Sequence, residues 1–232
     1  MTVIYWIVKK RVMKNLETEK YYKNEWVTKS IVWPDEQWYI LKFFKKDCEH
    51  EPYSYEEQSS IIEKKKQYIW KFLPETELIK NDDGTYCIKQ KFIEWKLLKF
   101  IDINKLDAEV LSDLLELFDW YIAYCKSEWI EMDVIGYQQD IHIHKPWWKR
   151  RFMFYSRILN GFLASTNIII SNDKRVYMID VCDTIPILKD DIISKTKSAV
   201  RNAIMNLWIK KTEYKIHRLI AEKNKELMET LS

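Results

Sequence analysis

One segment, residues 160–184, constrains this 232-residue chain most. A short loop leads to the apolar run 168–170. A polar turn and a second apolar run, 176–179, follow, and Asp180 comes directly after them. Two short apolar runs around a polar turn predict a β-hairpin. Asn167 stands directly before the first run, so the antiparallel pairing of a hairpin is expected to bring Asn167 and Asp180 to one end.

This segment resembles the metal-binding hairpin of protein kinases and of aminoglycoside-type small-molecule kinases. Those enzymes carry His-Gly-Asp-Leu-x-x-x-Asn-Ile-Leu-Val, followed by Ile-Asp-Phe-Gly-Asp, and the Asn and the second-strand Asp hold Mg²⁺ on the phosphates of ATP. The resemblance implies that Asn167 and Asp180 bind magnesium here. The matching positions are Gly161, Leu163, Asn167, Ile168, Ile179, Asp180 and Asp183.

The positions that carry catalysis in kinases differ in this chain. Phe162 stands in the register of the catalytic aspartate, and Asn160 replaces the preceding histidine. Val181-Cys182 replaces the Phe-Gly that follows the metal-binding aspartate. A phenylalanine neither accepts a proton nor orients a hydroxyl group. The resemblance therefore implies a nucleotide-binding pseudokinase with weak or absent phosphotransfer.

A second kinase-like feature lies upstream, in a strand followed by a helix. The apolar run 39–44 is interrupted by Lys42, and it resembles the kinase strand whose lysine contacts the α and β phosphates. Residues 54–70 predict a helix. Its Glu57 lies four residues before Ile61 and is expected on the inward side, where the resemblance implies a pair with Lys42. Glu56 and Glu63 are alternatives for the same role.

A third feature resembles the kinase hinge, whose backbone hydrogen-bonds the adenine edge. A predicted strand over residues 86–93 leads into Glu94 and Trp95, which resembles the end of a kinase small lobe. The resemblance implies that the backbone near Ile93 contacts the adenine of ATP. The features occur in kinase order along roughly residues 25–190.

Apolar periodicity changes from two residues to helical spacing near Leu97, and this change sets the expected architecture. Residues 106–129 predict a core helix and residues 189–232 predict two polar-faced helices. We expect an α+β, two-lobed protein kinase-like fold. Its β-rich small lobe would span 1–92, its hinge 93–100 and its mainly helical large lobe 101–232.

Composition limits the partners. A net charge of +3 with no polybasic tail gives no indication of a nucleic-acid partner. The apolar start of the chain is too short for a signal peptide or a membrane span. The four cysteines lie far apart without a C-x-x-C pair, which favours reduced thiols and a cytoplasmic protein. We also expect the protein to be bacterial and not to bind membranes.

Three functions stay open at the level of sequence. The first is the pseudokinase that binds ATP and Mg²⁺, with a protein partner also open. The second is an active atypical phosphotransferase in which Asp133, Asp140 or Asp183 replaces the missing carboxylate. The third is a structural or interaction module without a ligand, in which Asn167 and Asp180 only cap turns.

The chain holds 11 tryptophans and only 3 glycines, whereas about 7% of residues are glycine in a typical protein. Trp33 and Trp38 flank a predicted turn, and Trp95 stands where the kinase hinge usually has glycine. Some bacterial lineages read UGA as glycine, and a translation that reads UGA as tryptophan would produce this imbalance. We therefore expect some tryptophans to be glycine in the natural protein, with Trp6 and Trp208 as genuine core residues.

Overall fold

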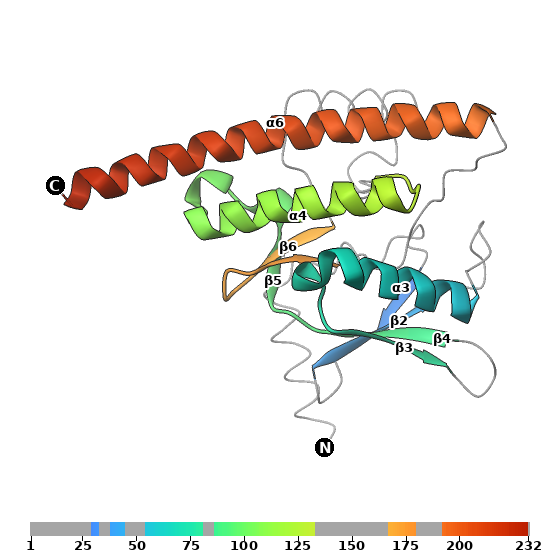
Figure 1. The fold of residues 1–232 in the computed structure, drawn as a ribbon. Helices are drawn as coiled ribbons and strands as arrows, with labels where there is room; N and C mark the ends of the chain where they lie inside the picture. Colours follow the sequence, from blue (N-terminus) through green and yellow to red (C-terminus); the bar gives the residue numbers. More distant parts are fainter. Residues whose placement is uncertain are drawn as a thin grey trace, which may run out of the picture. The chain divides into compact units, whose positions relative to one another are not determined.

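The computed structural model describes residues 29–32, 38–44, 54–80, 86–132, 167–179 and 192–231. Antiparallel sheets and α-helices are both present in these ranges, which confirms the α+β class. The described residues fall into two compact units (Figure 1). One unit contains strands β1 to β4. The other contains α3 from Glu56 onward, strands β5 to β7 and helices α4 and α6. The predicted lobe boundaries stay a prediction.

The first unit is an antiparallel sheet with the strand order β1-β2-β4-β3. A buried hydrogen bond between side chains crosses the outer β3–β4 pair, from Gln90 Nε2 to Thr76 Oγ1 at 3.1 Å. Cys87 of β4 is also buried, and burial raises the pKa of its thiol. The strands are β1 (Lys29–Val32), β2 (Tyr39–Phe44), β3 (Thr76–Lys80) and β4 (Tyr86–Lys91).

Helix α3 (Tyr55–Ile69) lies between β2 and β3 in the chain and continues into the 3-10 helix η1 (Trp70–Phe72). Its buried residues recur at spacings of four, three and four, as expected for one face of an amphipathic helix. This buried face consists of Gln58, Ile62, Lys65 and Ile69.

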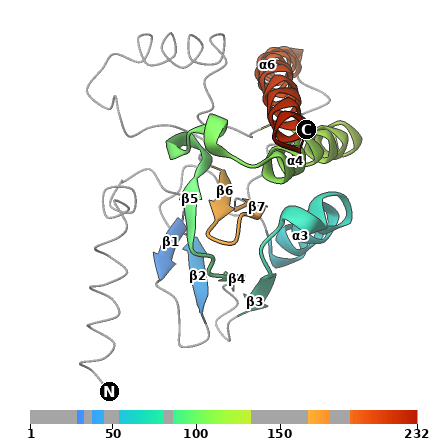
Figure 2. The ribbon, with the colours of Figure 1, turned by 90° about the vertical axis from the view of Figure 1, so that its left-hand side faces the viewer.

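The second unit is built around helix α4 (Ala108–Ser127), which confirms the core helix predicted for residues 106–129. Two 3-10 turns, η2 (Leu98–Phe100) and η3 (Ile103–Lys105), precede it. Helix α6 (Ile192–Leu231) runs antiparallel beside α4 (Figures 1 and 2). Trp208 of α6 is fully buried and packs edge-on against Phe118 of α4, with 5.8 Å between ring centroids.

The prediction of two helices in residues 189–232 is wrong, because α6 is a single helix of 40 residues. It contains neither glycine nor proline, the two residues that most strongly interrupt a helix. At 1.5 Å per residue it is about 60 Å long, twice the length of α4. Its buried positions end at Leu219, and most residues after Ile220 are exposed.

A three-stranded antiparallel sheet completes this unit, in the order β5-β6-β7. Its strands are β5 (Trp95–Leu97), β6 (Ile168–Ser171) and β7 (Val176–Met178). Strands β6 and β7 form the predicted hairpin, with Ile168 opposite Met178 and Ile170 opposite Val176. All four of these side chains belong to the same apolar core as α4 and α6. In the described part of the chain, no helix is long and apolar enough to cross a membrane.

Replacing Trp208 by alanine should destabilise the protein by about 3–5 kcal/mol, because it removes a fully buried aromatic ring. Tyr214 on the same helix is 75% exposed, so Tyr214→Ala is a matched control that should change stability by about 0.5 kcal/mol or less. Urea unfolding followed by circular dichroism measures both. Equal costs for the two variants would contradict the described packing of α6.

Candidate functional site

The β6–β7 hairpin positions Asn167. The backbone N–H of Ile179 donates to the carbonyl oxygen of Asn167 at 2.9 Å, which extends the hairpin pairing by one residue. The Asn167 side chain is buried, at 9% relative exposure. Asp180 is the next residue in the chain after Ile179, but it lies outside the described residues. The described hairpin thus places Asn167, one predicted metal ligand, opposite Ile179, which directly precedes the other predicted ligand, Asp180.

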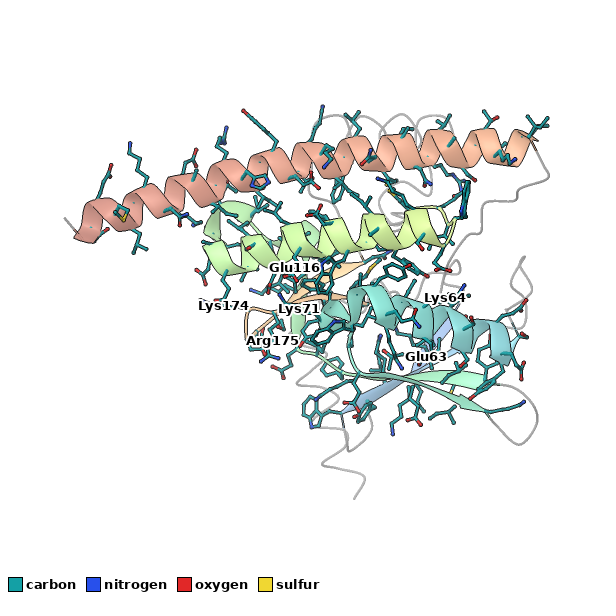
Figure 3. All side chains as sticks on the ribbon, in the orientation of Figure 1. Glu63, Lys64, Lys71, Glu116, Lys174 and Arg175 are labelled. Atoms are coloured by element: carbon teal, nitrogen blue, oxygen red, sulfur yellow. The ribbon has the colours of Figure 1, made fainter. Side chains whose placement is uncertain are left out.

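The other end of the hairpin is a tight turn. Lys174 N–H donates to the Ser171 carbonyl at 3.0 Å, and Ser171 N–H donates to the Arg175 carbonyl at 2.9 Å. Lys174 has φ of 64°, in the left-handed region. Its Nζ lies 2.6 Å from Asp107 Oδ2, at the start of α4 (Figure 3). This hydrogen bond lowers the pKa of Asp107 and raises that of Lys174.

The predicted hinge is attached to the turn end of the hairpin. The backbone N–H of Asn172 donates to the Glu94 carbonyl at 3.0 Å, and Asn172 Nδ2 donates to Glu94 Oε2 at 2.9 Å. Ile93 is half-buried directly before Glu94. The following strand β5 pairs with β6, with Trp95 opposite Ser171. Ser171 is four residue steps along the chain from Asn167, a span of about 13 Å at 3.3 Å per residue.

Lys42 is buried in the four-stranded sheet, at 8% relative exposure. In the strand register it lies between Ile31 of β1 and Ile88 of β4. Lysine is rarely buried to this degree unless its ammonium group has a specific role or partner. The burial is therefore compatible with a functional lysine, although Lys42 belongs to a different unit from Asn167.

The expectation that Glu57 lies on the inward side of its helix is wrong, because its side chain is exposed. Glu56 and Glu63 are exposed as well, and Glu63 pairs with Lys66 at 2.7 Å (Figure 3). The buried position next to Glu57 is Gln58, which has no exposed surface. The expectation took Ile61 as the inward residue, whereas Ile62 is the buried one, so the expected buried face of α3 was displaced by one residue. Gln58 precedes Ile62 by four residues, so taking Ile62 as the inward residue would have identified Gln58 as buried.

Four hydrogen bonds from three side chains of α3 and η1 connect these elements to α4 and its C-cap residue Glu128. Lys71 Nζ lies 2.8 Å from Asp113 Oδ1 and 2.6 Å from Glu116 Oε2 (Figure 3). The hydrogen bond to Asp113, followed by the one to Glu116, raises the pKa of Lys71. Lys64 pairs with Glu128 at 2.6 Å, and Tyr68 Oη donates to Ser127 Oγ at 2.6 Å. Phe72 of η1 and Trp120 of α4 also pack edge-on, with 5.6 Å between ring centroids.

A buried carboxylate that the sequence analysis did not identify lies at the far end of α4. Glu131 is 8% exposed and accepts a hydrogen bond from Ser198 Oγ at 2.5 Å. Arg201 of α6 pairs with its other oxygen at 2.6 Å. Met132 N–H donates to Asn202 Oδ1 at 2.8 Å. Residues 130–132 are therefore held on α6 directly before Asp133, one of the expected displaced carboxylates.

Several predicted residues lie outside the described residues: Phe162, Asp180, Asp183, Asp133 and Asp140. Their predicted roles stay predictions. Among the residues that the structure does describe, no group of three or more His, Cys, Asp and Glu side chains could hold a metal ion.

No family model matches this chain, and no curated protein is significantly similar to it. The kinase resemblance accordingly stands on the ordered motifs alone.

Replacing Arg201 by alanine should cost about 1–3 kcal/mol, because it leaves the buried Glu131 carboxylate with one charged partner fewer. The control is Arg218→Ala, whose partner Glu222 is 55% exposed, and it should cost less than about 0.5 kcal/mol. Chemical unfolding of both variants measures the difference. A cost for Arg201→Ala no larger than for the control would contradict the structural role of Glu131.

Lys71→Met should reduce stability by less than about 1 kcal/mol at neutral pH, because the Lys71 side chain is 39% exposed and its ion pairs are screened by solvent. The pKa of Lys71 is raised above its ordinary value of 10.5 in the folded protein. The contribution of Lys71 to stability is therefore fully present below pH 10.5 and is lost as the pH rises through the folded-state pKa. The difference between wild type and variant should therefore disappear in strong alkali. Unfolding curves across this range test the prediction, with the exposed Lys126→Met as control; a difference that persists in strong alkali would refute it.

Proposed function

We propose that this protein is a two-lobed, cytoplasmic, kinase-like pseudokinase that binds ATP with Mg²⁺ and transfers phosphate weakly or not at all. One observation supports the proposal most. The hairpin pairs Asn167 with Ile179, and Asp180 is the next residue in the chain. Amide and carboxylate oxygens are the hard ligands that Mg²⁺ prefers.

The order of elements around Lys42 supports the same proposal. Strand β2 carries the lysine, α3 follows it, and the β3–β4 hairpin then leads to Ile93. Strand β4 returns to pair with β2, which places Ile88 opposite Lys42. The kinase resemblance implies this order of lysine strand, helix and hinge strand. Burial of Lys42 supports the proposal as well, because a lysine without a specific role or partner usually lies at the surface.

In the second unit, the predicted hinge and Asn167 lie at opposite ends of the β5–β6 pair. The hinge backbone near Ile93 is tied to one end of the β5–β6 pair through Glu94 and Asn172. Asn167 precedes β6 at the other end. An adenine at the hinge would thus have its phosphates directed toward Asn167, about 13 Å along the strand.

The residues of the proposed site would have separate roles in binding the metal and the phosphates. Asn167 and Asp180 would hold Mg²⁺, and Lys42 would contact the phosphates directly. The metal neutralises phosphate charge that would otherwise repel the carboxylate. Phe162 in the catalytic-aspartate register supplies no general base, an aid typically worth about 10²–10⁴-fold in rate. Binding is therefore expected to persist where transfer is lost.

ATP binding tests the first half of the proposal. Calorimetry with ATP and Mg²⁺ should show binding that Asp180→Asn and Lys42→Ala both weaken, because each removes a charge that offsets the phosphates. Lys91→Ala is the matched control, since Lys91 lies in the same sheet with an exposed side chain. Likewise, Asn167→Ala should weaken binding more than Asn224→Ala in the exposed part of α6. Absence of binding in the unmodified protein would leave only the structural module.

Transfer of radiolabelled phosphate tests the second half. We expect none, or slow ATP hydrolysis at most. Rapid and specific labelling of a substrate would overturn the pseudokinase assignment in favour of an active phosphotransferase. Loss of that labelling in Asp133→Asn, Asp140→Asn or Asp183→Asn would then identify the displaced carboxylate.

A further inference from the structure

The second residue after helix α4 has a backbone conformation that favours glycine. Glu128 is the C-cap of the helix, and Trp129 after it has φ of 54°. The N–H of Ile130 then donates to the Cys125 carbonyl at 3.1 Å, which closes a turn of six residues from Cys125 to Ile130. This is the Schellman arrangement, in which the left-handed residue is most often glycine. Yet the residue here is a tryptophan that is 57% exposed.

The same combination occurs at Trp38, directly before β2. Its φ is 64° and its side chain is 48% exposed. Its carbonyl accepts a hydrogen bond from Phe92 N–H at 2.7 Å, so the left-handed turn is fixed by the sheet. The indole packs against the Phe92 ring, at 5.8 Å between centroids. For residues with a Cβ atom the left-handed conformation is unfavourable, and bulky residues rarely adopt it.

Two other tryptophans in the described residues differ clearly. Trp208 is fully buried against Phe118, and Trp120 packs edge-on against Phe72 at 5.6 Å. Neither has positive φ; within the described ranges the positive-φ residues other than glycine are Trp38, Trp129 and Lys174. Positive φ thus distinguishes Trp38 and Trp129 from Trp120 and Trp208, which pack against other aromatic rings.

We propose that Trp38 and Trp129 are glycines in the natural protein, encoded by UGA codons that the source organism reads as glycine. The composition supports this independently, with 11 tryptophans against 3 glycines. The proposal does not depend on nucleotide binding.

The source gene and the natural protein test this directly. We expect UGA codons at positions 38 and 129 and UGG codons at positions 120 and 208. Peptide mass spectrometry of protein from the source cells should find glycine at positions 38 and 129. A UGG codon, or a tryptophan-containing peptide, at either position would overturn the assignment for that position.

Stability of the chain as printed gives a second test. Trp129→Gly should raise the melting midpoint by about 2–4 °C, because glycine relieves the left-handed strain. Trp129→Ala removes the same exposed indole but keeps a Cβ atom, so it should raise the midpoint less. Trp70→Gly is the control at an exposed tryptophan in a 3-10 helix without positive φ, and it should lower the midpoint. Equal gains for glycine and alanine at position 129 would refute the conformational argument.

Discussion

Burial of α4 is the constraint on which the helical unit depends. Its apolar residues meet Trp208 and Ile209 of α6, the inward side chains of the β6–β7 hairpin, and Phe72 after α3, all in one core. Each fully buried aliphatic or aromatic side chain contributes roughly 1.5–3 kcal/mol from removal of apolar surface. Asn167 begins the hairpin whose alternate residues fill this core. The position of Asn167, the candidate metal ligand, therefore follows from apolar packing.

The polar contacts of the hairpin gather at its turn, away from Asn167. Asn172 holds Glu94, and Lys174 pairs with Asp107 at the surface. Exposed pairs of this kind contribute little stability, because water and salt screen them. They join the turn to Glu94 and to Asp107, the residue directly before α4. The opposite end, where Asn167 stands, is set by the β6–β7 ladder and by burial of Ile168 and Met178.

The hairpin and α4 were predictable because their signals are local. Isoleucines at 168–170 followed by a polar turn indicate a strand and its reversal, and the three- and four-residue spacing in α4 indicates a buried helical face. The side of α3 that is buried was not predictable with the same security. Ile61 and Ile62 are adjacent, so choosing Ile61 as the inward residue moved Glu57 inward and Gln58 outward, the reverse of what is found.

Long-range polar networks were beyond the reach of pattern reasoning. Glu131 meets Ser198 and Arg201 across 67 and 70 residues, and no periodicity links those positions. The length of α6 illustrates a different limit. A polar-faced sequence looked like two short helices, whereas the absence of glycine and proline lets one helix continue past the end of its packed face.

Binding and catalysis need different residues in the proposed site, and that difference explains how a pseudokinase could keep one without the other. Magnesium on a nucleotide usually takes one or two protein oxygens and completes its shell with phosphates and water. Asn167 and Asp180 would suffice for that, with Lys42 contacting the phosphates. Transfer also needs a group that orients the attacking hydroxyl, and Phe162 cannot serve. Because this group touches neither metal nor adenine, its loss would leave the nucleotide contacts intact, so a hairpin held by its apolar core could keep the metal ligands after the catalytic loop has changed.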